Sequence, residues 1–380
     1  MRTSGLGTVG PEHNLLVRFS ILAAALGSFV VSGQLHAQEL DRAETTTTEE
    51  AAPKEDSIGF DSGSFIAVPV PINDPTFGTG LVLGAGYLFK TDEGSNTSFI
   101  GGGVVGTNEE SYAGGLGASL SLDNNRYSGF FFLGAADVNY DLFVLGQPLR
   151  VEQQGAAFQG EFRYGFSEAW SGGISMRYLE SQLAGLNNTP LPPLLANVAD
   201  NSIATLGLVA QQDTRDDSFY PTTGSKLDFS LTYSKDVSGA DISYTHATLG
   251  YDQFWSLTDD SVVGARAAAC KIGGRAPFFD TCLLGAELRG FSLFEYFGDS
   301  MLTAQAEYRH RFTKRFGYVA FAGLGDVSKG DISIDSGVRY AGGLGLRYRV
   351  SKKFPLDVSL DVTLNDDEES YVYFSVGQAF

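Results

Sequence analysis

Side chains that could carry out catalysis are few in this sequence of 380 residues. It has four histidines, and two of them, His13 and His36, lie in the first 37 residues. No G-x-S-x-G, H-E-x-x-H or C-x-x-C motif occurs, so the spacings typical of serine hydrolases, zinc hydrolases and thiol redox centres are absent. His246 and His310 are isolated, and isolated histidines are mostly structural. We expect no enzyme, no metal and no cofactor, although a serine on a strand beside His246 remains an alternative.

Two cysteines and two glycine runs are the other candidates for chemistry. The runs GGGVVG and AGGLGLRY lack the lysine and the following helix of a phosphate-binding loop, so they indicate curved strands. Cys270 and Cys282 are twelve positions apart. In an exported protein we predict that they form a disulfide, which would contribute on the order of 3 kcal/mol. Two unpaired small residues are the alternative.

The most unusual charged residue is an arginine in a glycine-rich stretch. In GAELRGFSLFEYFG, residues 285–298, Arg289 stands between Leu288 and the pair Gly290 and Phe291. The chain around it alternates apolar and polar residues. What this arginine can do depends on the solvent that surrounds the chain.

Composition points to a membrane barrel. The chain has 47 Gly, 28 Phe and 17 Tyr, yet its mean hydropathy is only −0.04. No run of 18 apolar residues occurs after Val31, which excludes transmembrane helices there. A closed barrel is the other structure that can span a bilayer, and it conceals its hydrophobicity in alternation. The net charge of −19 argues against binding to nucleic acid.

The first 58 residues indicate export rather than a fold. Arg18 precedes the short apolar run 19–31, and a small-residue cleavage site follows near Ala37, so residues 1–37 are predicted to be a signal peptide. Residues 38–58 are acidic and rich in threonine, which is typical of a disordered linker, here in the periplasm. Residues 59–380 would form the barrel in the outer membrane of a Gram-negative type cell.

Alternation with a period of two predicts sixteen antiparallel strands. The expected ranges are 64–71, 76–90, 96–107, 111–123, 125–138, 154–166, 169–183, 201–213, 224–236, 242–257, 260–272, 300–312, 316–326, 338–350, 355–364 and 370–380. An even number places both ends of the barrel chain on one side. The short connections then fall on the periplasmic side, and the long ones, 139–153, 184–200 and 273–299, fall outside.

Three stretches resemble the BamA/TamA superfamily of outer-membrane assembly and translocation barrels. The turn QDTRDD…YPTTG resembles the family's D-x-R-D-D…F-P-T-x-G motif, and its members here are Asp213, Arg215, Asp216, Pro221 and Gly224. Leu288-Arg289-Gly290-Phe291 resembles the family's V/I-R-G-F/Y motif in the sixth extracellular loop. The ending YVYFSVGQAF resembles the last strand, with Gly377 at a kink and Phe380 as a terminal aromatic.

The resemblance implies that the sixth loop folds into the barrel lumen, where its arginine needs an acidic partner. On the strand 300–312, alternation directs Glu307 inward, at the position that matches the family's acidic residue. We therefore predict a bidentate pair between Arg289 and Glu307. The family's next strand carries a second acidic residue, but this sequence has Gly323 there. Either the anchor is looser, or Asp326 reaches in from the end of the strand.

The resemblance also bears on function. The linker is too short for the periplasmic POTRA repeats of the family, so we expect a barrel without them. The expected role is assembly or translocation of outer-membrane protein or lipid, with a weak seam between the first and last strands. Expected partners are outer-membrane lipid and a periplasmic or outer-membrane protein that replaces the POTRA module. A passive transport pore or a structural barrel is the alternative.

Overall fold

The computed structural model describes residues 59–376 apart from 61–62, 187–188, 194, 196–198, 218–219 and 350–356. The predicted signal peptide, the linker, Gly377 and Phe380 lie outside these residues. No helix in the described part of the chain is both long and apolar enough to cross a membrane.

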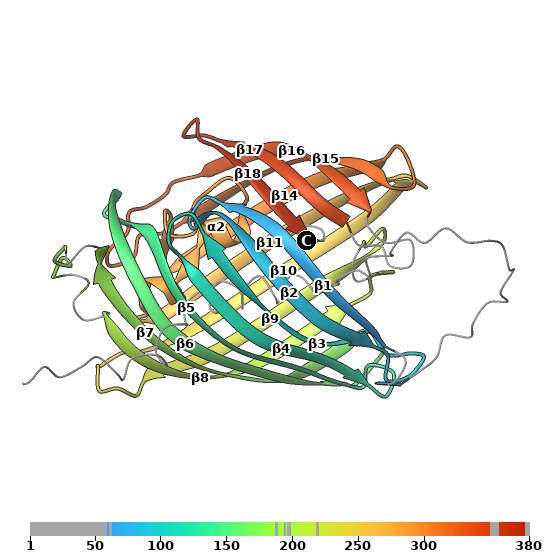
Figure 1. The fold of residues 1–380 in the computed structure, drawn as a ribbon, viewed down its shortest axis with the longest axis horizontal. Coiled ribbons are helices and arrows are strands. Elements are labelled where there is room, and N and C mark those ends of the chain that lie inside the picture. Colours follow the sequence, from blue (N-terminus) through green and yellow to red (C-terminus); the bar gives the residue numbers. More distant parts are fainter. Residues whose placement is uncertain are drawn as a thin grey trace, which may run out of the picture.

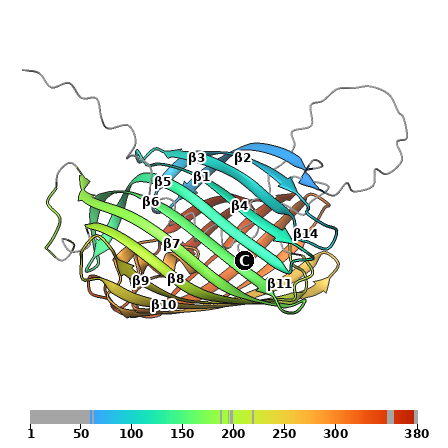
Figure 2. The same ribbon diagram turned by 90° about the horizontal axis from the view of Figure 1, so that it is seen from below.

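Sixteen antiparallel strands form one sheet that curls into a barrel (Figures 1 and 2). They are β1 (Ser64–Asp74), β2 (Gly78–Phe89), β3 (Ser98–Thr107), β4 (Tyr112–Leu122), β5 (Tyr127–Val144), β6 (Gln147–Gly165), β7 (Trp170–Gly185), β8 (Asp200–Asp213), β9 (Gly224–Asp236), β10 (Ser243–Thr258), β11 (Ser261–Gly274), β14 (Ser300–Arg311), β15 (Phe316–Val327), β16 (Arg339–Arg349), β17 (Asp357–Asn365) and β18 (Ser370–Val376). Each strand pairs with its neighbours in sequence order. The prediction of sixteen strands is confirmed.

The two faces of the sheet follow the predicted alternation. On β14, Leu302 is 65% exposed, whereas Glu307 and Arg309 are almost fully buried. On β17, Val362 is exposed and Asp361 is buried. In a bilayer the exposed apolar face would meet lipid, so the buried face has to pair its own charges.

The first and last strands lie side by side but are not paired like the others. The sheet order begins at β1 and ends at β18, so the described residues of these strands form no backbone ladder with each other. The amide Nδ2 of Asn73 donates to the carbonyl oxygen of Val372 at 2.7 Å. We call this junction of β1 and β18 the seam. Asn73 stands near the end of the barrel that carries the β1–β2 connection, which we call the loop end; the opposite end is the turn end.

One predicted loop is a hairpin. Residues 139–153 were expected to be a long outer loop, but β5 and β6 continue through them to a tight turn at Leu145 and Gly146, both with positive φ. Three inward-facing side chains of this extension, Tyr140, Leu142 and Val151, are fully buried. Tyr140 packs against the ring of Phe294, at 4.6 Å between ring centroids. The extension is ordered because it covers the segment between β11 and β14.

Candidate functional site

Residues 275–299, which we call loop six, connect β11 to β14 at the loop end and form a packed structure. They contain a short 3-10 helix, η4 (Phe278–Asp280), a one-turn helix, α2 (Leu284–Glu287), and the two-residue strands β12 (Cys282–Leu283) and β13 (Phe297–Gly298), which pair with each other. A disulfide joins Cys282 to Cys270 on β11, as the sequence suggested. Aromatic side chains of loop six are buried beneath the β5–β6 extension. Loop six is therefore attached to the strands of the barrel both by the disulfide and by apolar packing.

Arg289 lies against the inward-facing side chains of three strands. Its Nη2 is 2.9 Å from Oε2 of Glu307 on β14, the partner that the sequence named. Its Nη1 is 2.8 Å from Oδ2 of Asp361 on β17, and its guanidinium stacks on the ring of Phe321, 3.6 Å from the ring centroid. One arginine thus neutralises charge on two strands and covers an aromatic face on a third.

The second acidic partner comes from β17, a strand that sequence analysis predicted but did not connect with Arg289. Asp326 was an alternative, but it lies on the exposed face of β15. Residues separated by an odd number of positions on one strand face opposite sides, so Asp326 cannot share a face with Gly323. Asp361 takes the place instead, and it also pairs with Arg347. The available signal was the alternation along β17, which places Asp357 and Asp361 on the same buried face.

Gly323 makes room for loop six. A Cβ at this position would lie 2.6 Å from Cδ1 of Leu288 and 2.5 Å from Cγ of Gln305. Leu288 is fully buried there. The family motif has an acidic residue at this position. Glycine removes that charge and leaves the space that the side chain of Leu288 occupies.

Gly323→Val is expected to displace Leu288 and loosen loop six while the barrel still folds. Overpacking of this kind costs about 1–3 kcal/mol. The change should increase the rate at which a protease cuts within residues 275–299, and the heat-dependent shift of the folded barrel on a gel should persist. Ala322→Val, which faces outward from the next position, is the matched control. Equal protection in the two variants would contradict the packing role of Gly323.

Loop six also forms hydrogen bonds on both sides of the seam, with β18 and with the β1–β2 turn. The backbone N–H of Gly290 donates to the hydroxyl of Tyr373 on β18 at 2.9 Å, and its carbonyl accepts from Nδ2 of Asn365 at 2.9 Å. Gly290 has φ +112°, and a Cβ there would lie 2.7 Å from Cβ of Ala341, so only glycine fits. Three residues later, the N–H of Leu293 donates to Oγ1 of Thr76 in the β1–β2 turn at 2.7 Å. Between these contacts Phe291 is buried against the ring of Tyr296.

The turn motif between β8 and β9 is held by its own acidic residues. Arg215 forms a bidentate pair with Asp213, with Nε and Nη2 at 2.9 and 2.7 Å from the two carboxylate oxygens. Asp216 accepts from the backbone N–H groups of residues 222 and 223. Gly224 has φ +93°, and a Cβ there would lie 2.2 Å from the carbonyl oxygen of Thr214, so only glycine fits. The turn is therefore shaped by Asp213, Arg215, Asp216 and Gly224.

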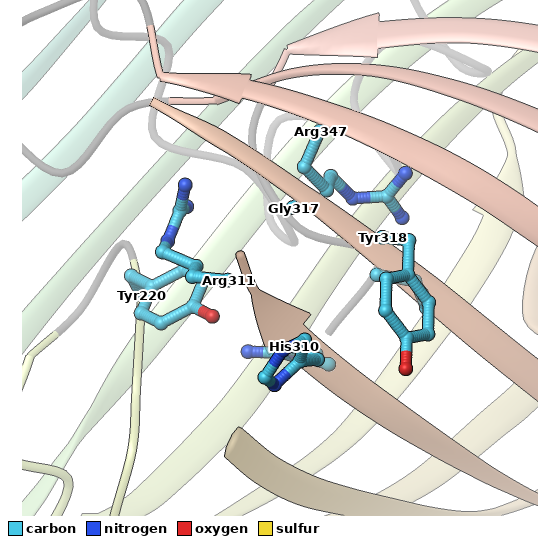
Figure 3. Close-up of a pocket in the computed structure, with 8 residues that line it drawn as sticks. Tyr220, His310, Arg311, Gly317, Tyr318 and Arg347 are labelled. Atoms are coloured by element: carbon cyan, nitrogen blue, oxygen red, sulfur yellow. The ribbon is translucent and has the colours of Figure 1, made fainter. Parts of the chain in front are cut away.

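The β8–β9 turn also contacts the charged residues that hold Arg289 of loop six. The carbonyl oxygen of Pro221, which is buried, lies 3.4 Å from Nη1 of Arg309, and Arg309 pairs with Glu307. Tyr220 and Arg311 lie next to each other in Figure 3, and the guanidinium of Arg311 is 4.6 Å from the centroid of the Tyr220 ring. A continuous set of contacts thus runs from Arg289 through Glu307 and Arg309 to the turn end. Sequence analysis missed it, because nothing local predicts that this turn crosses to β14.

Glu295 and Asp280 of loop six have pKa values that shift in opposite directions. Burial raises the pKa of Glu295 to about 7, against the lowering effect of the N–H of Ser292, and the nearby carboxylates of Glu369 and Asp367 add to the rise. For Asp280, burial acts to raise the pKa, but the pairing with Arg177 outweighs it and keeps the pKa below its usual value. Asp280 is therefore a fixed negative charge, whereas Glu295 takes up a proton near neutral pH.

The two isolated histidines are in different surroundings. His246 points inward from β10, and its Nε2 lies 3.2 Å from Sγ of Cys270, so its ring contacts the disulfide. His310 lies on the other face, as alternation predicted, and its Nδ1 is 2.8 Å from Oγ of Ser261.

Comparison with known proteins places these features in a family. A protein-family model described as the Omp85 superfamily domain matches residues 115–380. The fold is similar to BamA from Haemophilus ducreyi lacking POTRA domains 1–3, at 14% identity over 83% of this chain and 70% of that one, with a TM-score of 0.54. It is also similar to CdiB from Acinetobacter baumannii (17% identity, 83% and 59% of the two chains, TM-score 0.54) and CdiB from Escherichia coli (12%, 86% and 63%, TM-score 0.58).

At sequence identities of 12–17%, the similarities to these solved structures support a shared fold alone. The chain spans less than two thirds of either CdiB chain. No curated protein matches it in sequence.

Proposed function

Because the chain belongs to the Omp85 superfamily, we propose that it is an outer-membrane barrel that assembles or translocates protein or lipid through its seam. The observation that carries this proposal is the junction of β1 and β18. These strands lie side by side, yet a side-chain hydrogen bond from Asn73 takes the place of a backbone ladder in their described residues. In the proposal the seam opens toward the bilayer, and loop six holds its loop end.

The physical argument is the cost of an unpaired strand edge. Backbone N–H and C=O groups that face hydrocarbon without partners cost several kcal/mol each. An edge that opens in the membrane therefore binds a strand that can satisfy it, as in pairing by strand addition. A client strand would gain its first hydrogen bonds there, and the same opening would thin the local bilayer.

Clients would approach from the turn end. The proposal places this end in the periplasm, where the signal peptide would deliver the chain, and places lipid around the exposed apolar face. A periplasmic or outer-membrane protein would present clients to the turns, in the role that POTRA repeats have in the family. The long loops would face the outside.

A passive transport pore is the second candidate. The buried arginines at the turn end, among them Arg309, Arg311 and Arg347, favour it, because rings of one charge select ions in channels. Each of them, however, is paired with a carboxylate. Loop six also pairs with inward-facing carboxylates of β14 and β17 through Arg289. These contacts favour the assembly role.

A reconstitution experiment tests the two candidates. Liposomes that contain the purified protein are expected to speed the folding of a urea-unfolded outer-membrane barrel at least tenfold over empty liposomes. In planar bilayers the same protein should give small, unstable currents, because in the proposal loop six obstructs the lumen. Large, steady, voltage-independent currents without any acceleration of folding would instead support the passive pore.

A further inference from the structure

Three potential metal ligands converge where loop six is attached to the wall. Nε2 of His246 and Sγ of Cys270 and Cys282 all lie within 4.8 Å of one another, and Nε2 is 3.2 Å from Sγ of Cys270. They come from three different elements, β10, β11 and β12. While the disulfide is intact, the two sulfurs cannot act as thiolates. We propose that the reduced protein binds one Zn²⁺ ion with these three side chains, and that the ion then fastens loop six in place of the disulfide.

The geometry of the three ligands suits zinc. Zn–S and Zn–N bonds are about 2.3 and 2.0 Å, so tetrahedral angles require sulfurs roughly 3.8 Å apart and a nitrogen roughly 3.5 Å from each sulfur. The Cα atoms of the cysteines are 5.8 Å apart. Rotation of the two side chains after the S–S bond opens can provide the wider spacing. Nε2 of His246 is already close to the required distance from Sγ of Cys270 and within 4.8 Å of Sγ of Cys282.

Charge and burial favour the ion as well. Cys282 is 1% exposed and Cys270 is 8% exposed. Reduction by a thiol or a phosphine adds two electrons, breaks the S–S bond and leaves two thiols after uptake of two protons. Zn²⁺ displaces these protons and binds two thiolates and a neutral imidazole, so the site has no net charge. A neutral site is the form that a buried environment tolerates best. The fourth position would be open to water, as in zinc sites with three protein ligands.

The experiment compares oxidised and reduced full-length protein. The chain is refolded into detergent with and without a phosphine reductant, and alkylation of a denatured sample verifies the thiol count. Zn²⁺ is then measured by equilibrium dialysis, with Co²⁺ as a coloured substitute. We expect one ion per reduced chain, a thiolate-to-cobalt absorption band in the near ultraviolet, and no binding to the oxidised chain. Protease cleavage within residues 275–299 should be faster after reduction and should slow again, at least fivefold, when Zn²⁺ is added.

Variants separate this site from other metal binding. His246→Ala should weaken Zn²⁺ binding at least tenfold, whereas His310→Ala, the matched change on the opposite face, should leave it unchanged. Cys270→Ala with Cys282→Ala should abolish binding while the barrel keeps its heat-dependent gel shift. The proposal is overturned if the folded, reduced chain binds less than one ion, or if the two histidine variants bind equally well. It is also overturned if Zn²⁺ gives loop six no added protection.

Discussion

A disulfide introduced across the seam is expected to abolish acceleration of client folding. Asn73→Cys combined with Val372→Cys places two thiols where a side-chain hydrogen bond already joins β1 to β18. Once oxidised, the pair prevents the strands from separating at the loop end, so a client strand finds no free edge. We expect activity in the liposome assay to fall at least tenfold, to the level of empty liposomes, and to return on reduction.

A matched pair within the sheet is the control for this experiment. Val105→Cys with Ala113→Cys cross-links β3 to β4 at directly opposed residues, where a backbone ladder already exists. Both variants retain the native disulfide between Cys270 and Cys282, so reduction affects that bond equally in the two. Full activity of the oxidised seam variant, with the cross-link verified on a gel, would rule out a gating seam. The same loss in both variants would mean that cross-linking itself inactivates the barrel.

Glu307→Gln is expected to release loop six more completely than Arg289→Ala. Glu307 is fully buried between Arg289 and Arg309. Removing its charge leaves two guanidinium groups beside a neutral amide, which costs about 3–5 kcal/mol when a buried pair is broken. After Arg289→Ala, by contrast, Glu307 retains Arg309 and Asp361 retains Arg347. Protease cleavage within residues 275–299 and the mean conductance should rise in both variants, and more in Glu307→Gln.

The control for charge removal is Glu109→Gln. Glu109 pairs with Arg150, but both side chains are about one third exposed, and such pairs contribute about 0–1 kcal/mol. Glu109→Gln should leave the rate of protease cleavage within loop six unchanged. In the double variant of Arg289→Ala and Glu307→Gln, the effects should not add, because the two residues share one contact. Additive effects, or equal protection of loop six in Glu307→Gln and Glu109→Gln, would argue against the anchor.

The strands and their faces could be predicted because period-two alternation is a local signal. The face of Glu307 follows from counting along one strand, and so does the exposed position of Leu302. The β5–β6 extension could not be predicted in this way. Its order depends on the burial of Tyr140 against Phe294, which is more than 150 positions away in the sequence.

Contacts between distant strands escaped sequence analysis for the same reason. The family motif pointed to a carboxylate at position 323, and nothing in the sequence connects Arg289 to Asp361, 72 residues later. The role of the β8–β9 turn was missed as well, because the bond from Arg309 to Pro221 spans 88 positions. In each case the charged residue could be identified in the sequence. Its partner could not, because the two strands come together only when the barrel closes.

A path of contacts runs from Arg289 through Glu307 and Arg309 to Pro221. Binding at one end of the barrel and binding at the other end therefore affect each other's free energy. A molecule that binds the β8–β9 turn and draws Pro221 away from Arg309 alters the free energy with which Glu307 holds Arg289. By linkage, whatever pulls on loop six from outside must change the affinity of the turn by the same factor. In the proposed function, an antibody that binds loop six would therefore change the affinity of the β8–β9 turn for a client at the opposite end of the barrel.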